Sequence, residues 1–260
     1  MIIVRKSEER RQIADKDQKT WMTFDSENKA DPLQKGFNSL EILNEEIISP
    51  GSGFILHAHK DMIIVTYVRE GMIIHIGPLE KPDFIETKEF HKDDVASDTK
   101  QYAFNVSQSE DAHVFQCGFS KEDCAVDPGD SHVKTGGLKK LYTHAERQGV
   151  LKLIASSDGR ESSLPIHLGV EIFSTYIHKG NHIIHELKSG RTAWLHLVKG
   201  SVLINDVPLE AGDGAGFSDE RSVSFTANLP AEILLFDLCG QIPEKTKTEI
   251  QQKLETAGIQ

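Results

Sequence analysis

The chain has 260 residues, of which 38% are hydrophobic and 27% are charged, and its formal net charge at pH 7 is −11. This length allows a substantial core, arranged either as one large domain or as two domains of roughly 120–130 residues. The negative charge argues against direct binding to nucleic acid or to an anionic membrane, and no apolar run reaches the ~18 residues of a membrane-spanning helix.

The first informative stretch along the chain, residues 51–71, contains two histidines on a predicted strand. His57 and His59 are two residues apart, so on a strand both side chains project from the same face. Two imidazoles in this arrangement can serve as ligands of one transition-metal ion, such as Fe, Ni, Cu or Zn. They make half of a metal site, so the ligand set also depends on residues that come later in the chain.

Most of the remaining chain is predicted to form short strands separated by glycine and Asn/Asp turns. In the first half, the β-branched run 63–68 is followed by a turn at 69–71 and a second strand at 72–76. In the second half, strands are predicted at 194–198, 202–204, 207–209, 223–225 and 233–238. Strands at a spacing of about 8–12 residues are typical of a β-sandwich or β-barrel rather than of βαβ units.

The two halves share a strand–Gly–strand pattern at an offset of roughly 120–130 residues, which is the length of one small barrel. The chain is therefore predicted to contain two tandem barrels, residues 1–135 and 145–240, with a linker at 136–144. Pro243 and Glu244 open a polar segment, so residues 241–260 are predicted to form a short C-terminal helical extension.

The cysteines of the chain are Cys117, Cys124 and Cys239, an odd number without the spacing of a disulfide framework. This pattern favours reduced thiols in a reducing compartment. The first residues also do not have the basic-then-apolar order of a signal peptide. We therefore expect a cytoplasmic protein with three unpaired cysteines.

Taken together, several short motifs make the chain resemble the pirin family of two-barrel cupins, including its bacterial members. The pattern G-x5-H-x-H from Gly51 to His59 is the first metal motif of cupins. The other matching pieces are Val4–Arg10, Thr23–Phe24, Asp31–Pro32, Gly36–Phe37, Leu43–Glu46, Thr66–Gly71, Ser156–Gly159, Gly212–Gly214 and Asp219–Glu220. The resemblance implies an all-β fold of two cupin (jelly-roll) barrels.

The resemblance also implies one Fe-like ion in the N-terminal barrel, held by His-x-His and a later His-x-Glu, with a further Glu shortly after the His pair. In this chain Ile63 stands at the position of that Glu, Gln101 at the third histidine and Ala103 at the carboxylate. Gln101 offers an amide oxygen, a weak ligand for a transition metal. We therefore expect Fe, or Ni, Zn or Cu, to bind weakly at His57 and His59, with Gln101 as a weak third ligand.

Three further histidines, His75, His91 and His113, are candidates to complete the site, and each is equally compatible with a place in the core or at the surface. The resemblance also implies that the N-terminal barrel keeps a pocket beside the His pair. Its expected lining residues are Phe54, Leu56, Ile63 and Ala103.

Two functions of different classes follow from the resemblance. The first is a non-catalytic cupin that binds an unknown small molecule in the N-terminal barrel or serves as a regulatory partner of another protein, with no catalytic residue assigned. The second is a metal-dependent quercetin 2,3-dioxygenase, in which the ion binds the enolate oxygens of the substrate and a carboxylate takes its proton. Gln101 and Ala103 favour the first function.

Overall fold

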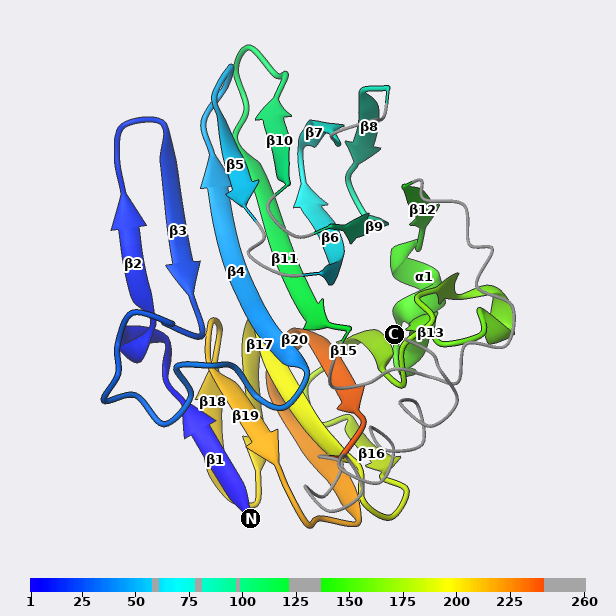
Figure 1. Cartoon of the computed structure of the whole chain (residues 1–260). Coiled ribbons are helices and arrows are strands. Elements are labelled where there is room, and N and C mark those ends of the chain that lie inside the picture. Colours follow the sequence, from blue (N-terminus) through cyan, green and yellow to red (C-terminus); the bar gives the residue numbers. More distant parts are fainter. Residues whose placement is uncertain (58–60, 78–80, 97–98, 122–136, 241–260) are drawn as a thin grey trace, which may run out of the picture.

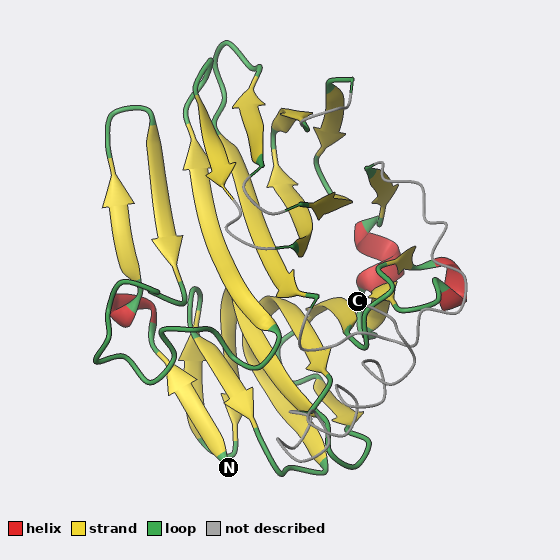
Figure 2. Cartoon of the chain, in the orientation of Figure 1, coloured by secondary structure: helices red, strands yellow, loops and turns green. Residues whose placement is uncertain are grey.

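The computed structural model of the chain describes residues 1–57, 61–77, 81–96, 99–121 and 137–240. Strands dominate these residues, and helical structure is limited to three short turns (Figure 2). The turns are η1 (Ser7–Glu9), α1 (His144–Arg147) and η2 (Arg160–Ser162). The predicted all-β fold is confirmed, while the helix predicted for residues 241–260 lies outside the described residues.

The N-terminal half contains two antiparallel sheets, seen at the top of Figure 1, with the strand orders β12-β9-β6-β11-β4-β3-β2 and β5-β10-β7-β8. The larger sheet consists of β2 (Arg11–Ala14), β3 (Gln18–Met22), β4 (Leu40–Ile48), β6 (Met62–Glu70), β9 (Glu89–Val95), β11 (Ala112–Ser120) and β12 (Leu138–Leu141). The smaller sheet consists of β5 (Gly53–His57), β7 (Met72–Ile76), β8 (Asp83–Glu86) and β10 (Lys100–Asn105).

An apolar cluster joins the inner faces of these two sheets. Its members from the larger sheet are Ile48, Val68, Ala112 and Val114, and those from the smaller sheet are Ile73, Ile85, Ala103 and the partly buried Phe54. Because side chains alternate along a strand, every second residue of each sheet faces this shared interior. Two opposed antiparallel sheets around one interior make a barrel of the jelly-roll kind.

The C-terminal half is built on two long strands, β17 (Thr192–Ile204) and β20 (Ser222–Leu238), which pair with each other. Their register shifts between Leu197 and Val202, and such bulges bend a strand so that it contributes to two sides of a barrel. The other strands of this nine-stranded sheet are β1 (Ile2–Arg5), β13 (Lys152–Ser156), β14 (Leu164–Pro165), β15 (Glu171–Ile177), β16 (His182–Glu186), β18 (Val207–Glu210) and β19 (Gly214–Phe217).

Two strands pair differently from what the predicted domain bounds imply. Strand β1 lies at the start of the predicted first domain, yet it pairs with β19 of the C-terminal half. Strand β12 lies in the predicted linker, yet it pairs with β9 of the N-terminal half. The pairing of β1 with β19 ties the two halves together through the backbone, and β12 extends the larger N-terminal sheet by one strand.

A large hydrophobic core also connects the two halves. Trp194 of β17 is fully buried, and its ring centroid lies 5.0 Å from that of Phe24 and 5.5 Å from that of Phe37. Phe119 of β11 contacts Phe236 of β20 at a centroid distance of 6.0 Å. Aromatic side chains bury large apolar areas, so the two barrels pack as one unit.

The cysteines differ from the expectation of three reduced thiols. Cys117 is a free, buried thiol, and burial raises its pKa well above the usual range. Cys239 is disulfide-bonded, so the prediction is wrong for this residue, and Cys124 lies outside the described residues. Bond formation depends on two cysteines meeting in space, which sequence spacing does not report.

Among the described residues, no helix is both long enough and apolar enough to cross a bilayer.

Candidate metal centre

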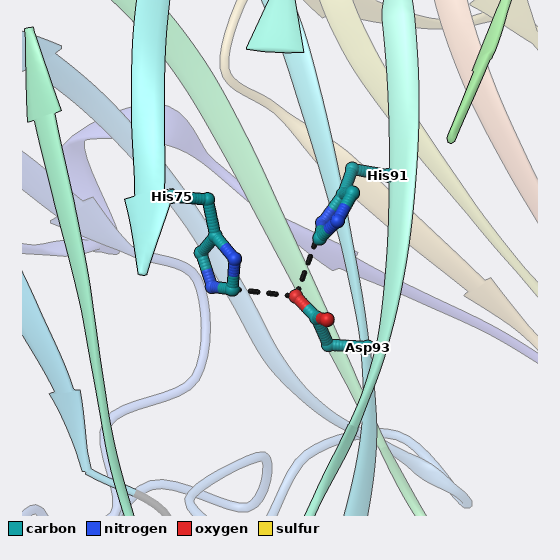
Figure 3. A group of neighbouring side chains, drawn as sticks. All are labelled: His75, His91 and Asp93. Carbon is teal, nitrogen blue, oxygen red and sulfur yellow. Dashed lines mark ion pairs between the residues drawn. The ribbon is translucent and has the colours of Figure 1, made fainter. Parts of the chain in front are cut away.

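Three side chains with metal-ligating groups meet inside the N-terminal barrel. His75 lies on β7 of the smaller sheet, and His91 and Asp93 lie on β9 of the larger sheet. Because His91 and Asp93 are two residues apart on one strand, their side chains point to the same face. Figure 3 shows both imidazole rings converging on the Asp93 carboxylate.

The strand register explains why these side chains face the interior. His75 is directly opposite Ala103 of β10, and Ala103 packs in the cluster between the two sheets. His91 is opposite Thr66, and Asp93 is opposite Ile64, on β6. Directly opposite residues of an antiparallel pair lie on the same face. The register therefore places His75 beside Ala103 on the inner face.

The distances within this group fit one shared ion. Asp93 Oδ2 lies 3.3 Å from His75 Nε2 and 3.0 Å from His91 Nδ1. Ligand atoms bound at about 2.1 Å to a single transition-metal ion are separated by about 3.0–3.4 Å. One ligand atom from each of the three residues lies within 4.8 Å of the others, and all three residues are buried.

Hydrogen bonding in the described residues also leaves room for a ligand at this site. Neither ring nitrogen of His91 has a hydrogen-bond partner, and neither does Asp93 Oδ2. Buried polar atoms without a partner are uncommon because they have lost their contacts with water. An ion bound by two imidazoles and one carboxylate would satisfy them, and two histidines with one carboxylate are a recurrent donor set for iron.

Two further residues surround His91. Asp83 Oδ2 lies 3.9 Å from His91 Nε2, and the other oxygen of Asp83 pairs with Lys139 Nζ at 3.1 Å. This places a carboxylate on the side of the ring opposite Asp93, where such groups orient metal-bound histidines. Gly137 covers the same edge, since a Cβ atom added there would lie 2.4 Å from His91 Nε2.

Of the four positions that the resemblance assigns to a metal, His57 is the last residue of β5, and Gln101 and Ala103 lie on β10. The backbone of His57 pairs with Lys100 at the end of β5, while His59 lies outside the described residues. Gln101 and Ala103 are both buried on β10. The family's third and fourth ligand positions therefore supply one amide and one methyl group.

The predicted pocket residues separate into two clusters. Phe54 and Ala103 share the cluster inside the N-terminal barrel. Ile63 is instead part of the core between the two halves, because both faces of β6 are buried and the face of Ile63 points to the C-terminal barrel. The backbone of Leu56 pairs with Gln101.

Of the three additional histidines, the structure brings together His75 and His91 but not His113. His113 Nε2 lies 2.9 Å from Glu45 Oε1, and Arg10 donates to the other oxygen of Glu45. Burial alone would raise the pKa of Glu45, but the hydrogen bond from His113 and the charge of Arg10 lower it to about 2. His113 therefore pairs with Glu45 and is not part of the candidate metal centre.

Asp93 was not among the residues predicted from the sequence. The signal that could have found it is the spacing His91-x-Asp93, which repeats the two-residue interval of His57-x-His59 on another strand. What the spacing could not show is that β7 brings His75 to the same point from the opposite sheet.

Comparisons with known proteins agree with this architecture. A family model described as the quercetinase C-terminal cupin domain matches residues 153–238. The chain is 31% identical to quercetin 2,3-dioxygenase of Escherichia coli K12 over 238 residues, which are 92% of this chain and 99% of that protein. It is 27% identical to the pirin-like protein of Caulobacter vibrioides over 208 residues, 80% of this chain and 86% of that protein.

Solved structures show the same relationship. The bacterial pirin YhhW from Escherichia coli in complex with nickel(II) aligns with a TM-score of 0.80 and 30% identity, covering 92% of this chain and 100% of that one. A second structure of YhhW aligns with a TM-score of 0.81 and 29% identity, covering 92% and 98%. Because this identity extends over nearly the whole chain, the protein belongs to the pirin family of two-barrel cupins.

Proposed function

We propose that this protein is a metal-binding pirin-family cupin whose ion is held by His75, His91 and Asp93, and that it does not carry out flavonol dioxygenation. One observation carries the proposal. The inner face of the barrel has an amide and a methyl group at the family's later ligand positions, while two imidazoles and a carboxylate meet beside Ala103.

Charge is the main reason to favour this ligand set over the His57–His59 pair. A divalent ion loses much of its hydration inside a barrel, and two neutral imidazoles do nothing to offset its charge. Asp93 adds a negative charge within 3.3 Å of one histidine nitrogen and 3.0 Å of another. The ligand set fits Fe(II), Ni(II) or Zn(II), since imidazole and carboxylate groups bind all three.

The alanine at the position that the resemblance assigns to a carboxylate is the reason to favour binding over catalysis. A bound ion would act as a Lewis acid toward an enolate oxygen of a flavonol. The reaction implied for the family also needs a carboxylate that takes the substrate proton, and Ala103 stands at that position. Loss of a general base typically costs 10²–10⁴-fold in rate.

One observation favours the dioxygenase as a second candidate. Two histidines and one carboxylate leave coordination positions open, which is the arrangement of non-haem Fe(II) oxygenases. In that case His75, His91 and Asp93 would hold the catalytic ion, and the reaction would take place on the β7–β9 side of the barrel.

Anaerobic loading with Fe(II) or Ni(II), followed by quercetin and O2, separates the two candidates. The proposal predicts about one bound ion per chain and no metal-dependent loss of quercetin above the protein-free rate. The variant Gln101→His with Ala103→Glu restores the family positions and should gain turnover. Quercetin turnover by the unmodified protein that His91→Ala abolishes would overturn the non-catalytic proposal in favour of the second candidate.

A further inference from the structure

The outer face of the smaller sheet in the N-terminal barrel is apolar on all four strands. Ala103 packs inside the barrel, so its neighbours Tyr102 and Phe104 point to the outside. Directly opposite residues of an antiparallel pair lie on the same face, and the register therefore defines two rows. The first row is Ile55, Tyr102 and Ile76, and the second row is Phe104, Ile74 and Phe84. These six residues are called the outer apolar face.

The side chains of the outer apolar face are open to solvent in the single chain. Ile55 is 56% exposed and Phe84 is 47% exposed, while Phe104 and Tyr102 are 40% and 37% exposed. An antiparallel sheet with one face in water places polar residues on that face. Although 27% of the chain is charged, none of these six residues is. The face therefore has the composition of a covered sheet rather than of a solvated one.

The two aromatic rings of β10 lie side by side on this face. The rings of Tyr102 and Phe104 are parallel within 4°, and their centroids are 6.5 Å apart. Gly53 of β5 leaves space for the Phe104 ring, since a Cβ atom added at Gly53 would lie 2.4 Å from that ring. Two sheets that pack face to face lie about 10 Å apart, and a flat apolar surface suits such packing.

The area of the outer apolar face fits the needs of a stable protein interface. Given the exposed fractions of its side chains, the face presents on the order of 400 Å² of apolar surface. A standard interface buries about 800 Å² of each partner, of which roughly 60% is apolar. The face therefore supplies most of the apolar area of one side of such an interface.

One positive and one negative residue lie at opposite ends of the same face. Lys100 is two residues before Tyr102 on β10, and Glu86 is two residues after Phe84 on β8. Both therefore project from the outer side of the sheet, and both are exposed. A twofold axis between two copies, perpendicular to the line from Lys100 to Glu86, brings Lys100 of each copy opposite Glu86 of the other.

We propose that the outer apolar face is the interface of a homodimer, in which two copies of the chain pack their smaller sheets face to face around a twofold axis. A second copy fits better than a strongly charged partner, because Lys100 and Glu86 leave the face without net charge. It fits better than an anionic membrane, because the chain has a net charge of −11. The proposal goes beyond the proposed function and does not depend on the metal ligands.

Sedimentation velocity of the full chain tests the proposal. We expect a dissociation constant in the micromolar range or below, as for other interfaces of this size. At about 100 µM the protein should then sediment with twice the 29.0 kDa mass of the chain. A chain that stays monomeric at this concentration would overturn the proposal. Sedimentation of that monomer with phosphatidylcholine vesicles would assign the face to a membrane instead.

The variants Ile55→Glu and Ile184→Glu form a matched pair. Ile55 is 56% exposed on the outer apolar face, whereas Ile184 is 59% exposed on β16 of the C-terminal half. Ile55→Glu places two like charges in the interface and should weaken the dimer at least about 100-fold. Ile184→Glu should change the dissociation constant by less than about threefold. Equal weakening in both variants, or none in Ile55→Glu, would overturn the proposal.

An exchange of charges tests the twofold arrangement without relying on the folding of Ile55→Glu. Lys100→Glu alone and Glu86→Lys alone each place like charges opposite one another, so each should weaken the dimer about three- to tenfold. The double variant Lys100→Glu/Glu86→Lys restores opposite charges and should dimerise within about threefold of the unmodified chain. Weakening in the double variant that equals or exceeds that of the single variants would contradict the proposed dimer.

Discussion

The two barrels share a fold, but they differ in whether their buried ionisable side chains have hydrogen-bond or ion-pair partners. In the C-terminal half, Asp237 pairs with Arg191 and Asp213 pairs with Lys6. In the N-terminal barrel, His91, Asp93 and Glu46 each have a buried atom without a hydrogen-bond partner. Burying polar atoms without partners is destabilising, and a barrel that serves only as support gains nothing from it. This difference supports the proposal that the metal is bound in the N-terminal barrel.

Among the described residues of the C-terminal half, Arg147 and His196 depart from this contrast. Arg147 Nε has no hydrogen-bond partner, although the other nitrogens of Arg147 donate to Tyr67, Ser174 and Tyr176. His196 also has ring nitrogens without a partner in the described residues, and it packs against Phe115 at the boundary between the halves. Burial, followed by the nearby charge of Arg10, lowers the pKa of His196 to about 3. The ring is therefore neutral and serves as part of the packed core.

The largest expected loss of stability comes from a substitution in the core of the C-terminal barrel. Leu235 is fully buried in the apolar cluster inside that barrel, so Leu235→Ala should lower the free energy of unfolding by about 2–5 kcal/mol. Urea denaturation measures the change. Metal content per folded chain should stay the same, and a loss of metal in folded Leu235→Ala would show that the barrels do not divide their roles in this way.

The contributions of the neighbouring residues Glu45 and Glu46 to the free energy of unfolding should change with pH in opposite directions. Burial raises the pKa of Glu46 to about 8, so folding is favoured at low pH and this contribution is lost as the pH rises from about 4.5 toward 8. Glu46→Gln should therefore stabilise the protein relative to the unmodified chain by on the order of 3 kcal/mol at pH 7, with little difference at pH 4.

Glu45 provides the matched control on the same strand. Although burial opposes ionisation, His113 and Arg10 lower its pKa to about 2, so its stabilising contribution is present above about pH 4.5 and lost as the pH falls toward 2. Glu45→Gln should destabilise the protein at pH 7. Unfolding curves of both variants from pH 3 to pH 9 measure these effects, and equal signs would show that Glu46 is not held as a neutral acid.

A smaller effect, on metal affinity, is expected from removing the Asp83 carboxylate beside His91 Nε2. Asp83 lies 3.9 Å from His91 Nε2, and loss of a group that orients a metal-bound histidine typically lowers affinity 10–100-fold. Asp83→Asn should show this decrease in a Ni(II) titration. Lys139→Met removes the ion-pair partner of Asp83 but keeps the carboxylate, so it should change affinity by less than threefold. Equal decreases would point to a general loss of structure.

The smallest effect is expected at Gly137. A methyl group there would lie 2.4 Å from His91 Nε2, so Gly137→Ala should displace the ring and lower Ni(II) affinity by up to about tenfold. The melting temperature should change little, because the group that must move is the end of a side chain. Unchanged affinity would show that the imidazole is free to shift without loss of the ion.

The strand pattern and turn residues were sufficient to predict an all-β fold of two barrels. The sequence could not reveal that β1 pairs with β19, because these strands are more than 200 residues apart and pairing at such distance leaves no local pattern. Ile63 shows a second limit. Both faces of its strand are buried, so alternation alone does not tell which of two cores a residue joins.

Two of the three residues of the candidate metal centre, His75 and His91, were predicted from the sequence, whereas Asp93 was not. The two-residue interval predicted His57 and His59 as a ligand pair. The same interval separates His91 from Asp93 and could have predicted Asp93 as a ligand. His75, His91 and His113 were all predicted as candidates, and only the register of β7 against β10 showed that His75 meets His91, since a site shared by two opposed sheets depends on tertiary structure.

The most direct test of this account is Ni(II) binding by isothermal titration calorimetry to four forms of the protein. We predict one site in the unmodified chain, loss of at least 100-fold in affinity for His91→Ala and for Asp93→Asn, and retention of the site in the double variant His57→Ala/His59→Ala. The removal of a ligand from a three-residue site should exceed the 10–100-fold effect of an orienting group. Binding that survives in Asp93→Asn but disappears in His57→Ala/His59→Ala would contradict the proposed metal centre.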